Sequence, residues 1–281
     1  MAMAERAVPG PGSVLARLAA AMALLAILGL VAVPVAWLAL TAFKYPRDVY
    51  EVTWLFKPTL ENFQVIFEPP WSIGRRLANS IVVAIATVAI AIPVAALAAY
   101  SFSRFAFALK RGLFFLVLAT QFIPAVVIVL PFYLMFRDLG LLDTRTGLVI
   151  VNLAIVTPFA VWMLKGFFDA VPVECDEAAL IDGASRLAIL RLVVVPMALP
   201  GVIVAAVFCF ILAWNEFIFA LILTRDHATT LQVGLASFRT ERGDVWELMA
   251  AAGILITVPA AIAATVIQKH FVAGLTGGAV K

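Results

Sequence analysis

The densest group of acidic side chains lies in one polar segment of the chain, which contains Glu174, Asp176, Glu177 and Asp182. Two carboxylates held close together can act as a general acid and a general base. On a continuous helix, at about 100° per residue, Glu177 and Asp182 are about 140° apart. This spacing argues against acid–base catalysis by the pair, and we assign no catalytic residue.

Other residue types that carry chemistry are sparse. His227 and His270 are the only histidines and fall in different loops, which excludes a metal site shared by the two. Cys175 lies in the polar segment and Cys209 in an apolar run, so we interpret both as packing residues. The sequence has no phosphate-binding Gly-x-x-x-x-Gly-Lys-Ser/Thr loop. Any ATP chemistry must therefore come from a partner, and we expect no metal or cofactor on this chain.

The composition places the chain in a membrane. Hydrophobic residues make up 64% of the 281 residues, charged residues make up 13%, and the mean hydropathy is +1.09. Soluble domains contain only about 45–50% apolar residues. The 20 Lys and Arg residues are scattered between apolar runs. They form no basic face for nucleic acid, which we exclude as a partner.

Apolar run length predicts the fold class. A spanning helix needs about 20 mostly apolar residues. Six runs qualify, at 18–43, 77–103, 112–136, 146–164, 192–224 and 248–268. The sequence therefore predicts an all-α integral membrane protein of about six transmembrane helices within residues 14–281. Residues 1–13, rich in Ala, Pro and Gly, are expected to form a disordered cytosolic tail.

The charge pattern gives a single indication of orientation. If both termini are cytosolic, the Lys and Arg residues divide equally between the two sides. The short Ser103–Arg111 connection carries three basic residues and no acid, which favours a cytosolic position. Both termini and the polar segment between the fourth and fifth spans are then cytosolic.

That polar segment, residues 172–191, has the signals of two short helices. Pro172 suits a helix start, and acids in the first turns are favoured by the helix dipole. Gly183 can adopt the left-handed conformation that ends a helix, and Asp182 is a good N-cap for a second helix through Ser185–Arg191. Two interpretations stay open: a protruding knob for a socket on a partner, or an amphipathic helix that rests on the lipid interface.

The stretch Glu177-Ala178-Ala179-x-x-Asp182-Gly183-Ala184 resembles the EAA loop of permease subunits of bacterial ABC importers. Pro196 and Pro200-Gly201, at the start of the next span, extend the likeness. In that family the loop forms a cytosolic coupling helix that sits in a cleft of the ATPase. The resemblance implies that the coupling residues are Glu177, Ala178, Ala179, Asp182, Gly183 and Ala184.

Three further segments resemble the second permease of the maltose, trehalose and glycerol-phosphate group. They are Asn79-Ser80, Ala213-Trp214-Asn215-Glu216-Phe217 and Gly274-Leu275-Thr276-x-Gly278-Ala279-Val280-Lys281. The chain departs from the family pattern at Leu187, Ala188 and Leu190, where polar or aromatic residues are common, and this leaves the docking contacts open.

The resemblance implies a multi-pass permease subunit in the bacterial cytoplasmic (inner) membrane. It would import a sugar or sugar derivative by alternating access. Its partners would be a second homologous permease, an external solute-binding protein and two ATPase subunits that hold ATP and magnesium.

Polar residues within the spans are candidates for the substrate pathway, because burying them in a membrane is costly. The candidates are Gln121, Tyr133, Asn152, Asn215 and Glu216. Sugars are commonly held by amides and acids beside aromatic faces, which Tyr133, Trp162 and Trp214 could supply. Amides also join helices to one another, and Glu216 has alternative roles in packing or gating.

A membrane enzyme or a proton-coupled carrier is the alternative class. A hydrolase needs a nucleophile and a base, or paired metal ligands, at matching depth. A proton relay needs several titratable groups along the path. The apolar cores of the predicted spans contain no His, Asp or Lys, and Glu216 alone is thin support.

Overall fold

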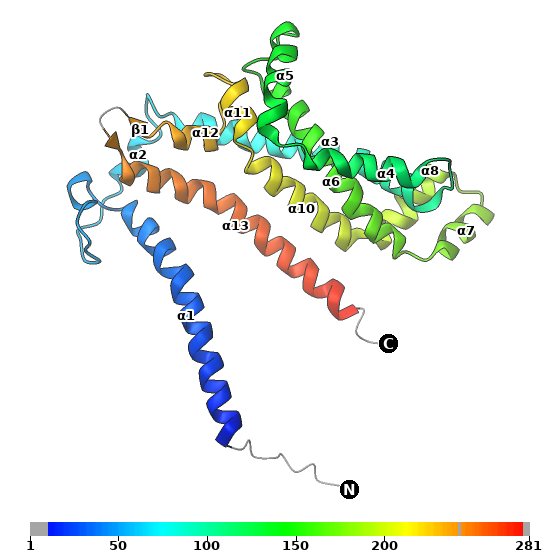
Figure 1. Ribbon diagram of the computed structural model, residues 1–281, viewed down its shortest axis with the longest axis horizontal. Helices are drawn as coiled ribbons and strands as arrows, with labels where there is room; N and C mark the ends of the chain where they lie inside the picture. The colour runs from blue at the N-terminus through cyan, green and yellow to red at the C-terminus, as the bar shows by residue number, and fades with distance from the viewer. Residues whose placement is uncertain (1–10, 241–242, 278–281) are drawn as a thin grey trace.

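Four long helices form the body of the structure. The computed structural model describes residues 11–240 and 243–277. The four helices are α3 (Ile73–Arg104), α6 (Arg145–Asp169), α10 (Leu199–Trp214) and α13 (Trp246–Gly277). Helix α3 packs along α6, and α10 packs against α3, α6 and α13 (Figure 1).

Shorter elements connect and flank the body. The helical ones are η1 (Pro46–Asp48), α2 (Glu61–Val65), α4 (Lys110–Ala119), η2 (Thr120–Phe122), α5 (Ala125–Asp138), α7 (Val173–Ile181), α8 (Arg186–Ile189), the π-helical turn η3 (Leu190–Val194), α9 (Val195–Met197), α11 (Ile218–Leu223) and α12 (Leu231–Ala236). The strands β1 (Arg239–Thr240) and β2 (Gly243–Asp244) pair antiparallel as a small hairpin.

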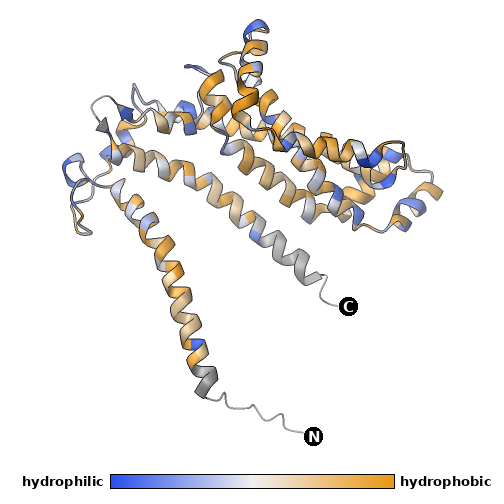
Figure 2. Ribbon diagram, viewed as in Figure 1, coloured by the Kyte–Doolittle hydropathy of each residue, from blue (hydrophilic) through white to orange (hydrophobic). Residues whose placement is uncertain are grey.

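The first helix, α1 (Pro11–Thr41), leans away from the body and meets α13 near its Thr41 end (Figure 1). The most apolar part of this helix, within Leu15–Thr41, has no buried residue. Figure 2 shows α1 apolar along most of its described length. A helix that is apolar all round needs an apolar surrounding. Its end is held by the Asn62 side chain, which donates to the Ala42 and Lys44 carbonyls at 2.9 and 2.8 Å.

Small side chains fill the contacts between the long helices. The buried alanines of these helices are Ala84, Ala91, Ala95, Ala96 and Ala99 of α3, Ala160 of α6, Ala205 and Ala213 of α10, and Ala250, Ala251, Ala252 and Ala263 of α13. Inside a membrane, where lipid is as apolar as the helices, association depends on such close backbone approach.

The close approach of the helices can be tested at Gly201, the glycine of α10 that packs against α6. A Cβ atom added there would lie 2.1 Å from Cγ of Phe167 on α6, so the ring lies directly on the glycine. Overpacking of this kind costs about 1–3 kcal/mol. We expect Gly201→Val to lower thermal stability in detergent. Gly253→Val is the control, because nothing lies within 4 Å of the Cβ position there. Equal stability of the two variants would contradict the predicted clash.

The predicted fold class is confirmed, but two of the spans are bent. Four of the described helices, α1, α3, α6 and α13, are each long and apolar enough to cross a membrane. Two bent helix pairs bring the number of spans to six if each pair is one span. The predicted third span, 112–136, is broken by 94° between Phe122 and Ala125. The reason is Pro124, which disfavours helical geometry at Ile123, and that residue is extended.

The predicted fifth span, 192–224, is also divided. The chain bends by 86° between Met197 and Leu199, so residues before the bend belong to a separate helical segment. Pro200 at the start of α10 favours a helix beginning there. A second break at Asn215–Phe217 separates α10 from α11. Apolar run length reports how much chain suits lipid and contains no information on such bends.

The remaining helices extend beyond the predicted runs. Helix α3 begins at Ile73 and α6 ends at Asp169, because both take charged residues into their ends. Helix α1 begins at Pro11, inside the segment expected to be a tail, so that prediction is wrong at residues 11–13. Residues 1–10 and the predicted C-terminal segment from Gly278 onward lie outside the described residues.

Candidate functional site

Helix α7 of the polar segment is ended by a specific backbone motif. Gly183 has a φ of +81°, in the left-handed region that favours glycine. Its N–H donates to the Leu180 carbonyl at 3.0 Å, and the Ala184 N–H donates to the Ala179 carbonyl at 2.9 Å. These two bonds form a Schellman motif, which satisfies the last carbonyls of a helix. The predicted role of Gly183 as a helix terminator is therefore confirmed.

The start of the second helix differs from the prediction. Asp182 is the C-cap of α7 and not the N-cap of α8. The cap of α8 is Ser185, whose hydroxyl accepts from the Ala188 N–H at 3.3 Å. Gly183 and Ala184 complete the end of α7, which moves the next helix start beyond Asp182. The two short helices lie together at one end of the body, which we call the α7 end (Figure 1).

The predicted coupling residues divide between two faces. Glu177, Ala178, Asp182 and Gly183 are exposed, together with Ile181, whose side chain is 88% exposed. Ala179 and Ala184 are partly buried and pack against the main apolar core. The segment thus presents a mixed polar and apolar outer surface and is fixed to the bundle from within.

Asp176 is the inner anchor of this segment. It is 2% exposed and pairs with Arg104 of α3, with Arg104 Nε 3.1 Å from Asp176 Oδ2. The Tyr100 hydroxyl donates to the same oxygen at 3.1 Å, and Arg104 Nη2 donates to the Val171 carbonyl at 2.8 Å. Removing one partner of a buried ion pair typically costs about 3–5 kcal/mol, because the other charge stays buried and uncompensated.

Sequence reasoning missed this role for Asp176 and Arg104. Asp176 was interpreted only as an acid in the first turns of a helix. A signal was present, because Asp176 lies three and four residues before Ala179 and Leu180. Such residues share one face of a helix, and here that face is the buried one. A buried acid requires a cationic partner. The spacing of residues within α7 cannot show which residue elsewhere in the chain supplies it.

The ion pair belongs to a wider polar network. Arg104 Nη1 donates to the Ser103 hydroxyl at 3.3 Å, and that hydroxyl donates to Asp169 Oδ1 at 2.7 Å. Lys165 Nζ lies 2.5 Å from Asp169 Oδ2. We call Tyr100, Ser103, Arg104, Lys165, Asp169 and Asp176 the Arg104 network. It joins α3, α6 and α7 at the α7 end.

A cavity of about 510 Å³ lies at the break in the third span. Thr120, Gln121, Pro124 and Phe132 line one side, and Ile155 and Pro158 of α6 and Phe219 of α11 line the other. The Gln121 side chain donates to the Ile155 carbonyl at 2.9 Å, which joins η2 to α6 beside the break. Gln121 is the one pathway candidate among the lining residues of this cavity.

The other amide and phenol candidates make local contacts. Asn152 is buried and donates to the Leu148 carbonyl of its own helix at 2.8 Å. Tyr133 is half-buried and packs against a second apolar cluster between α5, α6 and α11. Asn215 is exposed and donates to the Ile211 carbonyl at 2.9 Å. The structure does not bring these three residues to the lining of the cavity at the break.

Glu216 caps a helix. Its Oε1 accepts from the Phe219 N–H at 2.7 Å, and its Oε2 accepts from the Ala220 N–H at 3.0 Å. Both oxygens therefore satisfy backbone donors at the start of α11, as a capping acid does. This geometry favours the packing role of Glu216 over contact with substrate.

A second polar anchor lies at the opposite end of the body. The Asn79 side chain, fully buried, donates to the His227 and Thr229 carbonyls at 2.9 Å each. Its oxygen accepts from Arg145 Nε at 2.8 Å. The Ser80 hydroxyl accepts from the Leu231 N–H at 2.8 Å. The Asn79-Ser80 pair thus ties α3 to the segment between α11 and α12.

Asp143 holds the same segment from the other side. Its carboxylate accepts from the backbone N–H groups of residues 225, 226, 227 and 228 at 3.0–3.2 Å. Burial opposes ionisation, but these donors outweigh it and lower the pKa of Asp143 to about 2. His227 contributes only its backbone here, and the His270 side chain lies outside the described part of the chain. Within the described residues, no group of three metal-ligating side chains occurs.

The hydrogen bonds from residues 225–228 to Asp143 should contribute measurably to the stability of the protein. Asn tolerates the left-handed φ of +55° at this position, but it offers one carbonyl oxygen instead of two. We expect Asp143→Asn to cost about 1 kcal/mol at pH 7, a value already reduced for solvent screening. The lowered pKa means that the stabilisation is present above about pH 4 and is lost as the pH falls towards 2. The measurement is thermal unfolding of both proteins at pH 7 and pH 3, and a difference that does not shrink at pH 3 would contradict the assignment.

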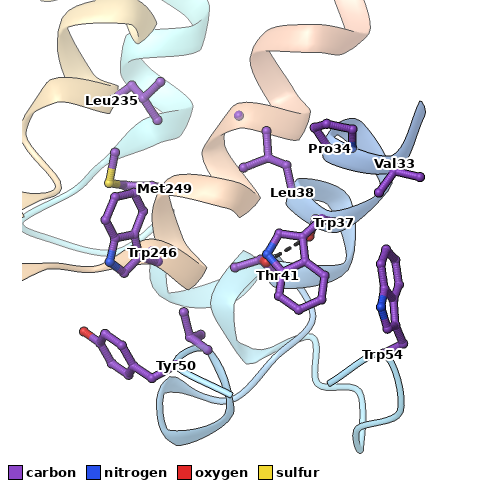
Figure 3. A pocket seen from close by; sticks show the side chains of 12 residues that line it. Val33, Pro34, Trp37, Leu38, Thr41, Tyr50, Trp54, Leu235, Trp246 and Met249 are labelled. Carbon is purple, nitrogen blue, oxygen red and sulfur yellow. Dashed lines mark hydrogen bonds between the residues drawn. The ribbon is translucent and has the colours of Figure 1, made fainter. Parts of the chain in front are cut away.

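A further cavity of about 760 Å³ lies where α1 approaches α13 (Figure 3). Its lining includes four aromatic side chains, Trp37, Tyr50, Trp54 and Trp246 (Figure 3). The Thr41 hydroxyl is satisfied by the Trp37 carbonyl at 2.8 Å. Among the described residues, no charged side chain lines the cavity, so their lining surface is apolar.

These features define the class of the protein as a multi-span membrane protein that presents a fixed helix pair at one end of its bundle. The chain belongs to the family of the binding-protein-dependent transport system inner membrane component, whose model matches residues 75–277. The family inferred from the Glu177–Ala184 segment is thereby confirmed, and its members are transport subunits.

Two relatives cover most of the chain. The trehalose/maltose transport system permease protein MalG of Thermococcus litoralis is 36% identical over 229 residues, which span 80% of this chain and 82% of the relative. The diacetylchitobiose uptake system permease protein DasC of Streptomyces coelicolor is 32% identical over 254 residues, 88% of this chain and 91% of the relative.

A solved structure supports the fold. A chain from the crystal structure of a bacterial ABC transporter involved in the import of the acidic polysaccharide alginate superposes with a TM-score of 0.79. The match covers 94% of this chain and 99% of that chain at 24% identity. The same overall fold therefore occurs in a chain of an ABC transporter.

Proposed function

We propose that the chain is one permease half of a carbohydrate importer, which takes a sugar or sugar derivative from an external solute-binding protein and moves it into the cytoplasm by alternating access. The names of the two relatives support this substrate class, since one transports trehalose and maltose and the other takes up diacetylchitobiose. A second, homologous permease would complete the path.

The observation that carries the proposal is the form of the α7 segment. Its outer face, with Glu177, Ala178 and Ile181, is exposed, while Asp176 fixes its inner face to α3. A helix resting on lipid would turn its apolar face to the membrane. Here the inward side chains Ala179 and Leu180 pack on the protein core instead. The arrangement favours a knob that docks in a partner, which we infer is one of two ATPase subunits that hold ATP and magnesium.

The pathway proposal rests on the break in the third span. Gln121 supplies an amide at the cavity there, and Phe132 and Phe219 supply aromatic surfaces, which suits a hydroxyl-rich ligand. We propose that Tyr133, Asn152 and Asn215 contact the substrate in other conformational states of the transporter. If each bent helix pair is one span, the six crossings would put both ends of the chain on the side of the α7 end, which we propose is the cytosol.

The proposed function is tested by cross-linking in the assembled transporter. In a chain with Cys175 and Cys209 changed to Ala, we expect Ala178→Cys to cross-link to the ATPase subunit. Asp138→Cys, exposed and remote in sequence from this segment, is the control. Cross-linking at residue 138 alone, or sugar uptake in proteoliposomes that needs a proton gradient and not ATP, would contradict the proposal and favour a carrier.

A further inference from the structure

We propose that a basic cavity at the α7 end binds the phosphate group of an anionic membrane phospholipid. The cavity is about 310 Å³ and is lined by Phe102, Lys110, Arg111, Phe114 and Lys165. We call these five residues the basic cavity. They come from the end of α3, the start of α4 and the last turns of α6, so the site is formed by the fold and not by one run of sequence.

The charges of the basic cavity are unbalanced. Lys110 and Arg111 have no acidic partner among the residues that the structure describes, whereas Lys165 pairs with Asp169 at 2.5 Å. Arg104, the other basic residue of this connection, is already engaged by Asp176. Lys110, Arg111 and Lys165, with Asp169 as the one neighbouring acid, give the site a net positive charge. Such a site favours an anionic ligand.

Aromatic rings help to place these cations. Lys165 Nζ lies 5.5 Å from the centroid of the Phe114 ring, and the Arg111 guanidinium carbon lies 5.8 Å from that of Phe115. Such cation–π contacts stabilise a charge over a ring. They leave the guanidinium donors of Arg111 and the Lys165 donors not used by Asp169 available, and a phosphate offers the matching acceptors.

The surroundings identify the source of the phosphate as a lipid. Four large apolar side chains of the α4 region, next to the basic cavity, are exposed: Leu109, Leu113, Phe115 and Leu116. Leu109 is 79% exposed and lies at the very start of α4. An apolar surface that begins at a basic cavity matches a phospholipid, with its acyl chains along α4 and its head group in the cavity. A free phosphate ion would leave that surface unused.

The test is native mass spectrometry of the purified chain with phosphatidylglycerol, with phosphatidylcholine, and with inorganic phosphate. We expect one tightly retained phosphatidylglycerol, bound at least about tenfold better than phosphatidylcholine, and no displacement of it by millimolar phosphate. The variant Lys110→Gln/Arg111→Gln should lose this preference about tenfold. Because neither side chain forms an ion pair with any residue that the structure describes, the variant should fold normally, which thermal unfolding checks.

The matched control is Arg17→Gln/Arg191→Gln, which removes the same charge from two exposed positions outside the basic cavity. It should keep the preference for phosphatidylglycerol. Equal retention of the two lipids by the unaltered chain, or equal loss in both double variants, would overturn the proposal. Displacement of the lipid by inorganic phosphate would also overturn it, in favour of a soluble anion as the ligand.

Discussion

Replacing Arg104 by Met should reduce ATP-driven uptake tenfold or more in the assembled transporter. The change leaves Asp176 buried without its cation, which typically costs about 3–5 kcal/mol. The ion pair that is lost is the contact that fixes α7 to α3, so this contact is weakened. We expect the α7 segment to detach from the bundle, so that ATP hydrolysis continues at its basal rate but is no longer stimulated by the loaded binding protein. Uptake and hydrolysis are measured in the same proteoliposomes.

A double variant separates this role from simple damage to the fold. Asp176→Asn alone leaves Arg104 unpaired, and Arg104→Met/Asp176→Asn removes both charges. Two contacting residues should show an interaction energy in such a cycle, so the double variant should be better than the sum of the single ones. Arg17→Met, at an exposed arginine of α1, is the control for loss of charge. Additive losses would show that the two side chains do not act as a pair.

The segments that suit lipid could be predicted from the sequence, but their shape could not. Apolar run length depends only on composition, and composition records that residues 112–136 suit lipid. The 94° bend there depends on which side of Pro124 finds packing partners. Pro93 lies inside the long helix α3, whereas Pro124 lies at the break and directly precedes α5. The difference lies in the tertiary contacts that satisfy or replace the lost hydrogen bond.

The candidate site was predictable to the extent that it is local. Gly183 ends its helix through bonds to residues within the same turn, so its role follows from residue type. Asp176 needs Arg104, which is 72 positions away, and a single sequence gives no means to match them. Glu216 was named for its charge within an apolar run. Its partners are backbone N–H groups of the following helix, which exist only once the chain has bent at Asn215–Phe217.

Replacing Gly183 by Val should uncouple hydrolysis from uptake by about tenfold while leaving the protein in the membrane. Nothing lies within 4 Å of a Cβ atom added at Gly183, so the variant meets no steric obstacle from neighbours. The obstacle is the backbone, because the φ of +81° costs a non-glycine residue about 1–2 kcal/mol and a β-branched residue more. The strain is relieved by undoing the Schellman motif, which turns α8 relative to α7 and misplaces the knob.

Two variants isolate this backbone effect. Gly166 of α6 also has open space around its Cβ position but lies within a helix, so Gly166→Val should couple normally. Asn tolerates the left-handed conformation, so Gly183→Asn should retain most of the coupling. The ratio of sugar transported to ATP hydrolysed should rank Gly183→Val below Gly183→Asn and both below Gly166→Val. If Gly183→Val transported normally, the angle between α7 and α8 would have no part in coupling, and only the outer surface of α7 would remain as the contact that transmits the ATPase movement.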